Sequence, residues 1–388
     1  MKTREEIRLA WLIPSVKGGY YWQPFFKEVT NLFPQMVLFT GYWSGFLKRF
    51  QDSFTVKIVG ESQQILSEKH SETGYTSSFI YASPAIILDL LKFKPDVVFS
   101  SYFSIWTLLA LLFKPVGNWK VVIFYDGSSP TVDAVNSKVR LYSRRLMSRF
   151  TDAFLTNNRG GKSYLVNHLN VKESCIFIQP YQVADIQTLC ENYDKKLTQL
   201  QLKSPIFLFV GQVIPRKGVK NLLDACILLK KQGYQNYTLL MVGDGEQKEE
   251  LKTYSQEAGL EQIVQWVGQV KYNQLGTYFQ QSDVFVLPTL EDVWAVVVSE
   301  AMAFGKPVLC SKWAGAYELV REGENGYVFD PNQPEDLAVA MRDFITNHPN
   351  LTETMGKKSV EFISEYTPQK AAEVVAQIVS FVFDQKLN

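Results

Sequence analysis

The stretch from Pro288 to Val308 reads PTLEDVWAVVVSEAMAFGKPV, and it decides how the rest of the chain is interpreted. A β-branched run ends at its start, two acids follow, and an apolar helical segment then carries one carboxylate, Glu300. A carboxylate among apolar residues is costly unless a partner satisfies it. Ribose or sugar-ring hydroxyls would be such a partner, with the helix start facing a diphosphate. The alternative is structural, with Asp292 as a helix cap and Glu300 in a partly exposed salt bridge.

A second turn of interest follows an earlier predicted strand, Ile206–Val210. The turn begins with Gly211 and Gln212 and reaches Arg216 and Lys217 just before a predicted helix. Two cations at that place form a cradle for an anion, because the start of a helix adds its own partial positive charge. A surface basic pair without a ligand is the alternative interpretation.

Two more glycine turns follow the next two predicted strands. The first contains Gly243 and Gly245, with Asp244 between them as a candidate helix cap. The second leads into Gln269 and Val270, which could offer backbone groups to a nucleotide base. Ligands of open α/β sheets bind at the carboxyl ends of the strands, where all of these turns are expected. For the first of them, a cap and turn without a ligand is an equal alternative.

Short apolar strands alternate with helical segments along nearly the whole chain, which predicts βαβ units and parallel sheets with helices on both faces. The 388 residues, 46% of them apolar, are enough for two domains that each bury a core. We predict a first domain over residues 1–184, a polar linker over 185–204 and a second domain over 205–366. An amphipathic helix is expected over 367–388.

Composition excludes several classes of protein. The net charge of +1 argues against a nucleic-acid binder, and four scattered Cys indicate neither a disulfide framework nor a zinc cluster. Three His are too few for a His-rich metal site, so no metal is expected. The N-terminus lacks the pattern of a signal peptide, and the longest apolar run, Ile105 to Phe113, is too short to span a bilayer. We therefore expect a cytoplasmic protein.

The charge is unevenly divided between the two halves. Residues 1–190 hold 21 Lys and Arg against 14 Asp and Glu. Much of this excess lies in one predicted helix, at Lys138, Arg140, Arg144, Arg145 and Arg149. Contact with an anionic membrane surface or an anionic acceptor is one interpretation, which would make the protein peripheral on the inner face of the cell membrane. A solvated helix face is the other.

In this order the motifs resemble the retaining nucleotide-sugar glycosyltransferases of family four. Their mark is an acid, seven residues, a Glu and then Ala-Met-Ala-x-Gly-x-Pro-Val, which Asp292 through Glu300 and Ala301–Val308 match. The likeness is good over residues 205–345 and vaguer over 1–180. It implies the GT-B fold: two doubly wound Rossmann-like domains that face a central cleft, with a C-terminal helix packing back toward the first domain.

The resemblance also implies roles for the residues of these motifs. Lys217, with Arg216, would neutralise the donor diphosphate as it leaves, and Glu300 would bind the donor ribose. Asp292 would hold the donor sugar together with the loop amides of Val293, Trp294 and Ala295. The acceptor hydroxyl would attack from the front face, with its proton passing to the leaving phosphate, so that the anomeric configuration is retained.

The remaining donor contacts implied by the resemblance come from glycine turns in both halves. A glycine pair after the first predicted strand would let that loop close on the diphosphate, although a tight turn alone is an equal interpretation. The donor-binding residues outside the acidic loop are therefore Gly18, Gly19, Gly211, Gln212, Gly243, Gly245, Gln269 and Val270. The partners implied are a nucleotide-sugar donor and a glycan or lipid-linked acceptor in surface polysaccharide or glycolipid synthesis, without metal and without nucleic acid.

The chain departs from the family pattern at four places. Gln212 stands where many members have Arg, and Arg216 is the candidate substitute. Asp292 stands where a Glu is usual, unless Glu291 serves as the first acid, and Ala295 where a Gly is common. Many members also place a His near the sugar in the first domain. No His lies in a matching loop here, so Asp126, which follows a predicted strand, is the candidate for that role, against a turn cap.

Two other functions stay open at the level of sequence. A nucleotide-sugar epimerase or hydrolase on the same fold would need an acid–base set in the first domain, and the lack of a suitably placed His speaks against it. A non-catalytic nucleotide-sugar-binding subunit of a glycan-synthesis complex is the second. Lys217 and Glu300 argue against a decayed site, whereas Gln212 leaves this alternative open.

Overall fold

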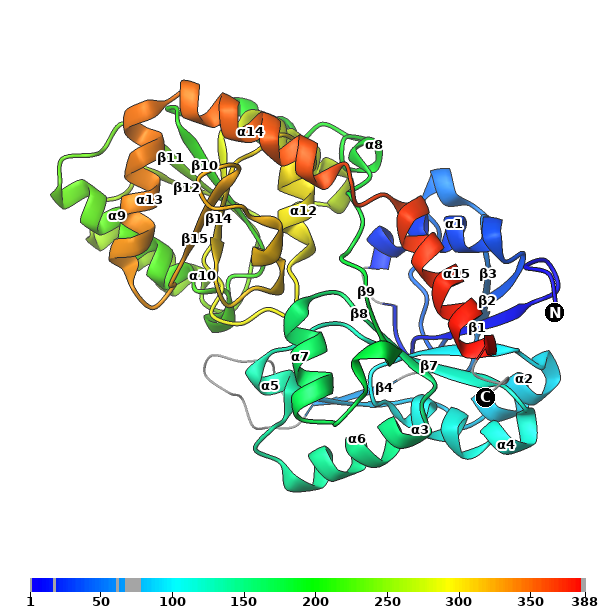
Figure 1. Ribbon diagram of the computed structural model, residues 1–388. Coiled ribbons are helices and arrows are strands. Elements are labelled where there is room, and N and C mark those ends of the chain that lie inside the picture. The colour runs from blue at the N-terminus through cyan, green and yellow to red at the C-terminus, as the bar shows by residue number, and fades with distance from the viewer. Residues whose placement is uncertain (1, 17–18, 61–62, 67–77, 385–388) are drawn as a thin grey trace. The chain divides into compact units, whose positions relative to one another are not determined.

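The computed structural model describes residues 2–16, 19–60, 63–66 and 78–384, and the chain divides into two compact units. Unit 1 holds most of the chain up to Gln182 together with the C-terminal segment from Tyr366. Unit 2 is Val183–Glu365. In each unit a parallel sheet is covered by helices on both faces (Figure 1), which confirms the predicted α/β class.

The sheet of unit 1 has seven parallel strands in the order β3-β2-β1-β6-β7-β8-β9. Its central strands are buried except at the first residues of β1 and β7, as expected for parallel strands covered on both faces. The strands are β1 (Arg8–Leu12), β2 (Gln35–Thr40), β3 (Thr55–Ile58), β6 (Val97–Ser101), β7 (Lys120–Tyr125), β8 (Ala153–Thr156) and β9 (Ile176–Ile178). A separate antiparallel pair, β4 (Gln63–Leu66) and β5 (Ser78–Tyr81), was not expected from the sequence.

The crossover helices of unit 1 connect these strands. They are α1 (Gln23–Leu32), α2 (Ile86–Phe93), α3 (Ile105–Leu112), α4 (Lys114–Gly117), α5 (Pro130–Asp133), α6 (Lys138–Phe150) and α7 (Arg159–Asn167). Ser104 and Ser137 begin α3 and α6 as N-caps, each accepting a hydrogen bond from a backbone N–H three residues on.

The last helix, α15 (Pro368–Asp384), belongs to unit 1 although unit 2 precedes it in the sequence. Thr367 caps its start by accepting a hydrogen bond from the Lys370 N–H, and Pro368 suits the first helical position. Its apolar face packs on α1, and the rings of Phe177 and Phe381 lie 5.4 Å apart. The expected return of the C-terminal helix to the first domain is confirmed.

Unit 2 has six parallel strands in the order β12-β11-β10-β13-β14-β15. Their register places Val210 beside Val242, so that neighbouring strands end together at one edge of the sheet. The strands are β10 (Ile206–Val210), β11 (Thr238–Val242), β12 (Val264–Gly268), β13 (Val284–Leu287), β14 (Val308–Ser311) and β15 (Gly326–Phe329).

The helices of unit 2 cover both faces of this sheet (Figure 1). They are α8 (Ile186–Leu189), α9 (Val219–Lys231), α10 (Lys248–Glu257), α11 (Leu275–Gln281), α12 (Val296–Ala303), α13 (Pro334–Asn347) and α14 (Asn350–Ile363). Of the helices that the structure describes in either unit, none combines the length and the apolar character that crossing a bilayer requires.

The segment expected to be a polar linker, residues 185–204, packs against unit 2. Asp194 is buried, accepts a hydrogen bond from the Tyr278 hydroxyl at 2.9 Å, and has its N–H bonded to Thr277. Close packing also brings Cys190 against Gly276. Its polar composition suggested a linker, but these polar groups are satisfied by α11.

Candidate functional site

Three glycine turns meet at the carboxyl edge of the unit 2 sheet. The Gly211 N–H donates to the Val242 carbonyl at 3.0 Å, and the Gly243 N–H donates to the Gly268 carbonyl at 2.9 Å. The backbone of Gly243 has a φ of 141°, and a Cβ there would lie 1.7 Å from the Gly211 carbonyl oxygen. Only glycine fits this approach, so the turns form one backbone-lined surface at the end of β10, β11 and β12.

The basic turn before α9 is locked to the acidic loop after β13. Lys217 ends the short 3₁₀ turn Pro215–Lys217, and Gly218 follows with a φ of 64°. A Cβ on Gly218 would lie 2.1 Å from the Pro288 carbonyl oxygen. The Leu290 N–H donates to the Arg216 carbonyl at 2.8 Å. The two loops are therefore held as one rigid element.

Asp292 lies at the centre of this element, between the two cations of the basic turn. Its Oδ2 is 2.5 Å from Lys217 Nζ and 3.4 Å from Arg216 Nη1, while its Oδ1 accepts a hydrogen bond from the Trp294 N–H. Burial alone would raise the pKa of Asp292, but the charges of Lys217 and Arg216 outweigh it and hold the pKa below its usual value. Asp292 is thus an ionised counterion that orients both cations.

The loop from Asp292 into α12 is strained at one position. Ala295, which precedes the helix, has a φ of 77°, a conformation that favours glycine. A neighbouring strap holds it there: the Asp292 N–H donates to the Trp313 carbonyl at 3.0 Å, and the Ala316 N–H donates to the Trp294 carbonyl at 2.8 Å. Backbone strain of this kind persists only where the surroundings impose it, and it gathers at functional sites.

Glu300 lies inside α12 and is 5% exposed. Burial raises the pKa of its carboxyl to about 7, and a hydrogen bond from Tyr272 lowers the pKa only in part. Tyr272 follows the turn that contains Gln269 and Val270, so Glu300 is linked to that turn. The expected alternative, a partly exposed Glu300 in a salt bridge, is wrong because the side chain is buried and its hydrogen bond comes from a tyrosine.

The other residues predicted for this site lie on the same loops. Gln212 and Gln269 are exposed, whereas Val270 and Val293 are half-buried. Gly245 packs its backbone on the Val213 carbonyl, where a Cβ would come within 2.3 Å. The structure therefore gathers every unit 2 residue predicted for donor binding onto the loops after four strands of one sheet, β10 to β13.

Asp126 and Gly19 belong to unit 1, and Gly18 lies outside the described residues. Asp126 follows β7, where its carboxylate accepts hydrogen bonds from the Tyr181 hydroxyl and from Asn157. Gly19 begins the 3₁₀ turn Gly19–Trp22, and the Trp22 ring packs edge-on against Tyr181. Tyr181 thus joins the two predicted positions within unit 1.

Sequence reasoning missed two tyrosines that hold candidate carboxylates. Tyr272 bonds Glu300 and Tyr181 bonds Asp126, each from a loop far from its partner in the chain. The only available signal was that each tyrosine follows a strand by a few residues, which is too common to single them out. The pairing depends on which strand ends are neighbours.

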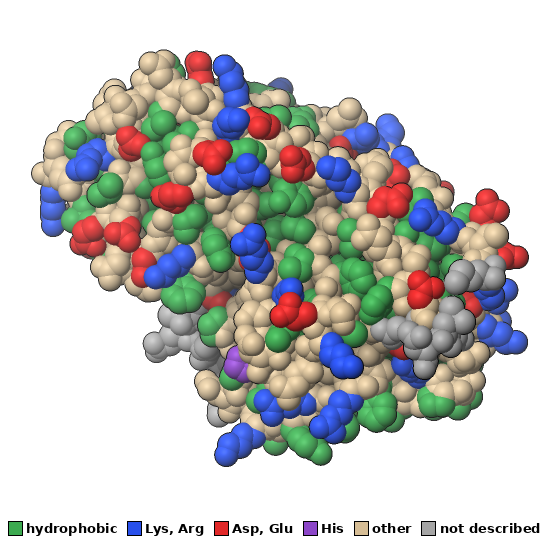
Figure 2. Space-filling model, in the orientation of Figure 1, with side chains coloured by type: hydrophobic (Ala, Val, Ile, Leu, Met, Phe, Trp, Pro, Cys, Tyr) green, Lys and Arg blue, Asp and Glu red, His purple; other side chains and the backbone are tan. Residues whose placement is uncertain are grey.

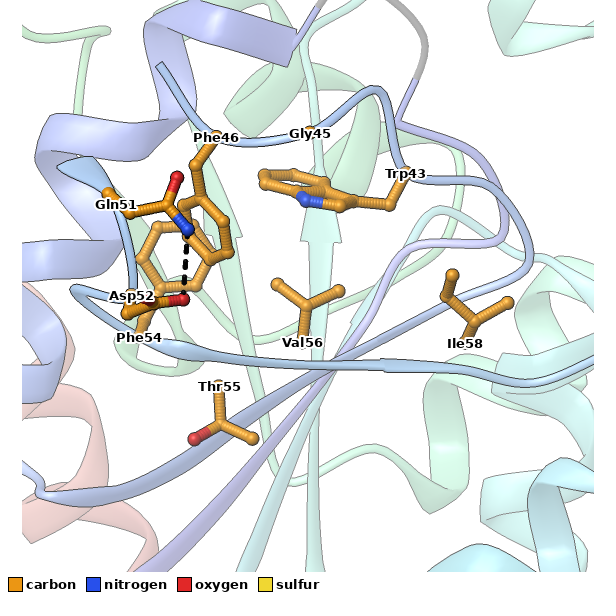
Figure 3. Close-up of a pocket in the computed structure, with 9 residues that line it drawn as sticks. All are labelled: Trp43, Gly45, Phe46, Gln51, Asp52, Phe54, Thr55, Val56 and Ile58. Atoms are coloured by element: carbon orange, nitrogen blue, oxygen red, sulfur yellow. Dashed lines mark hydrogen bonds between the residues drawn. The ribbon is translucent and has the colours of Figure 1, made fainter. Parts of the chain in front are cut away.

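A hollow of about 670 Å³ lies elsewhere in unit 1, beside the edge strand β3 (Figure 3). Trp43 and Phe46, from the loop after β2, lie opposite Val56 and Ile58 of β3, with Phe54 behind them. None of the residues predicted for the site lines this hollow. This hollow beside β3 is therefore separate from the predicted chemistry.

The unit 2 loops suit a ligand that carries both a diphosphate and vicinal hydroxyls. Lys217 and Arg216 offer fixed positive charge, and the glycine turns offer backbone at close range. Glu300 is a buried acceptor for hydroxyl donors. Within residues 2–16, 19–60, 63–66 and 78–384, no cluster of three or more His, Cys, Asp or Glu is placed to hold a metal ion.

Comparison with known proteins agrees with this geometry. A family model described as Glycosyl transferases group 1 matches residues 191–362. An uncharacterized glycosyltransferase of Haemophilus influenzae is 32% identical over 181 residues, 46% of this chain and 49% of that protein. The amylovoran biosynthesis glycosyltransferase AmsK of Erwinia amylovora is 27% identical over 199 residues, 48% of each chain. The chain spans about half the length of the curated relatives it matches.

Among solved structures, Anabaena HepE in complex with UDP has a TM-score of 0.74 at 17% identity, and the match covers 96% of this chain and 100% of that one. At this identity the likeness shows the fold alone. It confirms the GT-B class expected from the sequence, with one parallel α/β unit in each half of the chain.

Proposed function

We propose that this protein, whose residues 191–362 match the family model described as Glycosyl transferases group 1, transfers a sugar from a nucleoside diphosphate to an acceptor hydroxyl with retention of configuration. The observation that carries the proposal is the arrangement around Asp292 and Glu300. Asp292 lies beside two cations in the loop after β13, and Glu300 is buried in α12, the helix that follows this loop. A nucleoside diphosphate presents the matching groups, a diphosphate and a ribose.

Each residue then has a defined task in the transfer. Lys217 and Arg216 neutralise the diphosphate as the bond between the anomeric carbon and the phosphate oxygen breaks. The acceptor oxygen forms the new bond on the same face, and its proton passes to the departing phosphate oxygen. Asp292 keeps both cations in place and, through the amides of residues 293–295, positions the donor sugar.

Glu300 is proposed to accept hydrogen bonds from the donor ribose. Hydroxyl donors stabilise the charged form of a carboxylate and so lower its pKa. Because burial holds the pKa of free Glu300 at about 7, nucleotide binding near pH 7 should release a fraction of a proton from this residue. A ligand that leaves Glu300 untouched would release none from it.

Calorimetric titration with UDP tests this role, and UDP is the first choice because the HepE structure contains it. Glu300→Ala should weaken UDP binding roughly 10–150-fold, since charge-assisted hydrogen bonds are worth about 1.5–3 kcal/mol. Proton release, measured in phosphate and in Tris buffer, should disappear in Glu300→Gln. The matched control is Glu335→Ala, at an exposed position of the same unit. Wild-type affinity in folded Glu300→Ala would refute the ribose role, and GDP and ADP complete the panel.

Substitution of Asp292 is expected to affect a different step from substitution of Glu300, namely turnover and not nucleotide binding. Asp292→Asn leaves Lys217 and Arg216 to the ligand, so affinity for the nucleoside diphosphate should be retained while turnover of the sugar donor falls. The readout is release of nucleoside diphosphate from the sugar nucleotide in the presence of acceptor. If the wild-type protein binds donor but shows no turnover with any acceptor, it is a binding subunit and not an enzyme.

No metal ion is proposed for the reaction, because Lys217 and Arg216 supply the positive charge that a divalent ion would otherwise bring. Activity should therefore survive EDTA. Loss of turnover that Mg²⁺ or Mn²⁺ specifically restores would contradict this.

We further propose that the protein acts in the cytoplasm, on a growing surface glycan or a lipid-linked sugar. The support is the similarity to AmsK, which is named for amylovoran biosynthesis, over about half of each chain. Transfer to lipid-linked acceptors extracted from membranes, compared with soluble oligosaccharides, tests the class of acceptor.

A further inference from the structure

One face of helix α6 carries a row of exposed apolar side chains. Val139, Tyr142, Leu146 and Phe150 recur at intervals of three and four residues and are 80%, 72%, 45% and 59% exposed. That spacing puts them in one stripe along the helix. Met147 is the only residue of α6 that is buried, so the apolar side chains of the stripe face solvent and not the interior of the unit.

The apolar stripe continues onto the neighbouring helices α3 and α4. Leu108, Leu112 and Val116 follow one another at intervals of four and are 38%, 63% and 72% exposed. α3 packs against α6, and Lys114 Nζ donates to the Phe150 carbonyl at 2.8 Å. Among the described residues, nine of eighteen exposed large apolar side chains lie between residues 88 and 150, so this surface is a concentration and not a random scatter.

The charges that flank the stripe have a single sign. Lys138, Arg140, Arg145 and Arg149 of α6 are exposed, and the sequence has no Asp or Glu between residues 97 and 125 or between 134 and 151. Basic and apolar side chains lie next to one another along the lower edge of this unit in Figure 2. We call the exposed side chains of α3, α4 and α6 together the α6 face.

Arg144 must be removed from the five cations that the sequence suggested. Its guanidinium turns inward and donates to the carbonyls of Val132 and Asp133 and to the Tyr164 hydroxyl, at 2.9, 2.7 and 2.8 Å. Arg145 stays exposed, although its Nε donates to the His168 carbonyl. The cations left for an outside partner are Lys138, Arg140, Arg145 and Arg149.

We propose that the α6 face docks the protein on a membrane that contains anionic lipid. The apolar stripe would enter the boundary between headgroups and acyl chains, and the flanking cations would meet the anionic headgroups. Charge complementarity and the apolar stripe together favour an anionic membrane. A helix face that only contacts water would leave the four apolar side chains exposed, and so would an acidic surface without an apolar layer.

Vesicle sedimentation with the full chain tests the proposal. Phosphatidylcholine vesicles are compared with vesicles that also contain about 30% phosphatidylglycerol as the anionic lipid. Two triple variants separate the two contributions: K138E/R140E/R149E, and V139N/Y142N/L146N. Binding to the anionic vesicles should fall by at least about 100-fold in the first, since each surface cation contributes about fivefold and the introduced carboxylates repel the anionic headgroups. It should fall by at least about 30-fold in the second.

A matched charge control is K231E/K252E/K357E, at three exposed lysines on helices of unit 2. It makes the same change in net charge and should leave vesicle binding within about twofold of wild type. Equal losses in this control and in K138E/R140E/R149E would overturn the proposal, because the effect would then follow net charge alone. Unchanged binding in V139N/Y142N/L146N would also overturn it.

A second copy of this chain is the competing occupant, and light scattering in solution distinguishes it. The proposal predicts the same molecular mass for wild type and V139N/Y142N/L146N. A wild-type dimer that this variant converts to a monomer, with vesicle binding unaltered, would assign the α6 face to self-association. None of the substituted residues belongs to the proposed donor site, so UDP affinity should be unchanged in every variant, and failure of membrane docking would leave the sugar-transfer proposal standing.

Discussion

At the carboxyl edge of the unit 2 sheet the loops meet backbone to backbone, whereas at the same edge of unit 1 they meet through side chains. In unit 2, Gly243 lies against the Gly211 carbonyl and Gly218 against the Pro288 carbonyl. In unit 1, the Tyr181 ring and hydroxyl join the Gly19–Trp22 turn to Asp126. Backbone contacts demand glycine at fixed places, while a tyrosine–carboxylate contact can be built in many ways.

The carboxylates of the two units also differ in the kind of partner that surrounds them. Asp292 is held ionised by Lys217 and Arg216. Asp133 of unit 1 is buried, which raises its pKa, and the hydroxyls of Ser128 and Tyr125 offset the rise only in part. Unit 2 therefore keeps fixed opposite charges at its strand ends, and unit 1 keeps hydrogen-bonded acids. The cations that would bind an anion in unit 2 are therefore held in place before any ligand binds.

The largest expected effect breaks the backbone contact of unit 2. Gly243→Ala adds a Cβ 1.7 Å from the Gly211 carbonyl oxygen at a φ of 141°, so the free energy of unfolding should fall by about 3–5 kcal/mol. Gly19→Ala in unit 1 meets side chains and no backbone, Val16 at 2.3 Å and Trp22 at 3.4 Å, and should cost less. Urea unfolding of both variants makes the measurement. Equal losses would remove the distinction between the two edges.

The next largest effect distinguishes what the charged cluster contributes to stability from what it contributes to ligand binding. Lys217→Ala leaves Asp292 buried with Arg216 as its remaining charged neighbour, so stability should fall by about 3 kcal/mol. Adding Asp292→Asn should restore most of that stability, because the buried charge is gone, without restoring affinity for UDP. Thermal unfolding and calorimetric titration of the single and double variants test this. A double variant as unstable as Lys217→Ala would show that the lysine acts by packing alone.

Glu300 gives a pH dependence with a defined sign. Its pKa is about 7 in the folded chain against 4.5 for an ordinary Glu, so between these values the folded chain holds a proton that the unfolded chain has lost. Stability from this residue is therefore complete below about pH 4.5 and falls, by up to about 3 kcal/mol, as the pH rises to 7. Glu300→Gln should lack this loss. Unfolding curves of both proteins from pH 5 to 8 decide it, and parallel pH profiles would contradict the assignment.

The smallest expected effect concerns the strained start of α12. Ala295→Gly relieves a φ of 77° and should raise stability by about 0.5–1 kcal/mol. Ala295→Val, with a β-branched side chain at the same angle, should lower it. A gain in stability with a loss of turnover would mark the strain as functional, and a loss of stability in the glycine variant would show that the strap around Trp313 imposes no strain.

The sequence of unit 2 predicted where its candidate site residues lie relative to the strands, because glycine turns and short motif spacings are local features. Gly211, Gly243 and Gly245, the Arg216–Lys217 pair and the spacing from Asp292 to Glu300 all lie at strand ends, as expected. Two features that the sequence did not specify, the packing of residues 185–204 on α11 and the inward turn of Arg144, depend on side-chain partners. A polar segment and a basic helix look the same in sequence whether their groups face water or a neighbouring element.

By itself, the sequence determined the βα alternation, the glycine turns and the apolar helix around Glu300, because local spacing specifies all three. Only the tertiary structure decided which groups these motifs meet. It paired Asp292 with Lys217 and Arg216, and it placed Tyr272 where its side chain hydrogen-bonds Glu300. It also turned Arg144 inward and left Val139 and the other side chains of the stripe exposed to water. The physical reason is that charge pairing, burial and exposure depend on which strand ends and helix faces are neighbours, and strand order in a parallel sheet does not follow order along the chain.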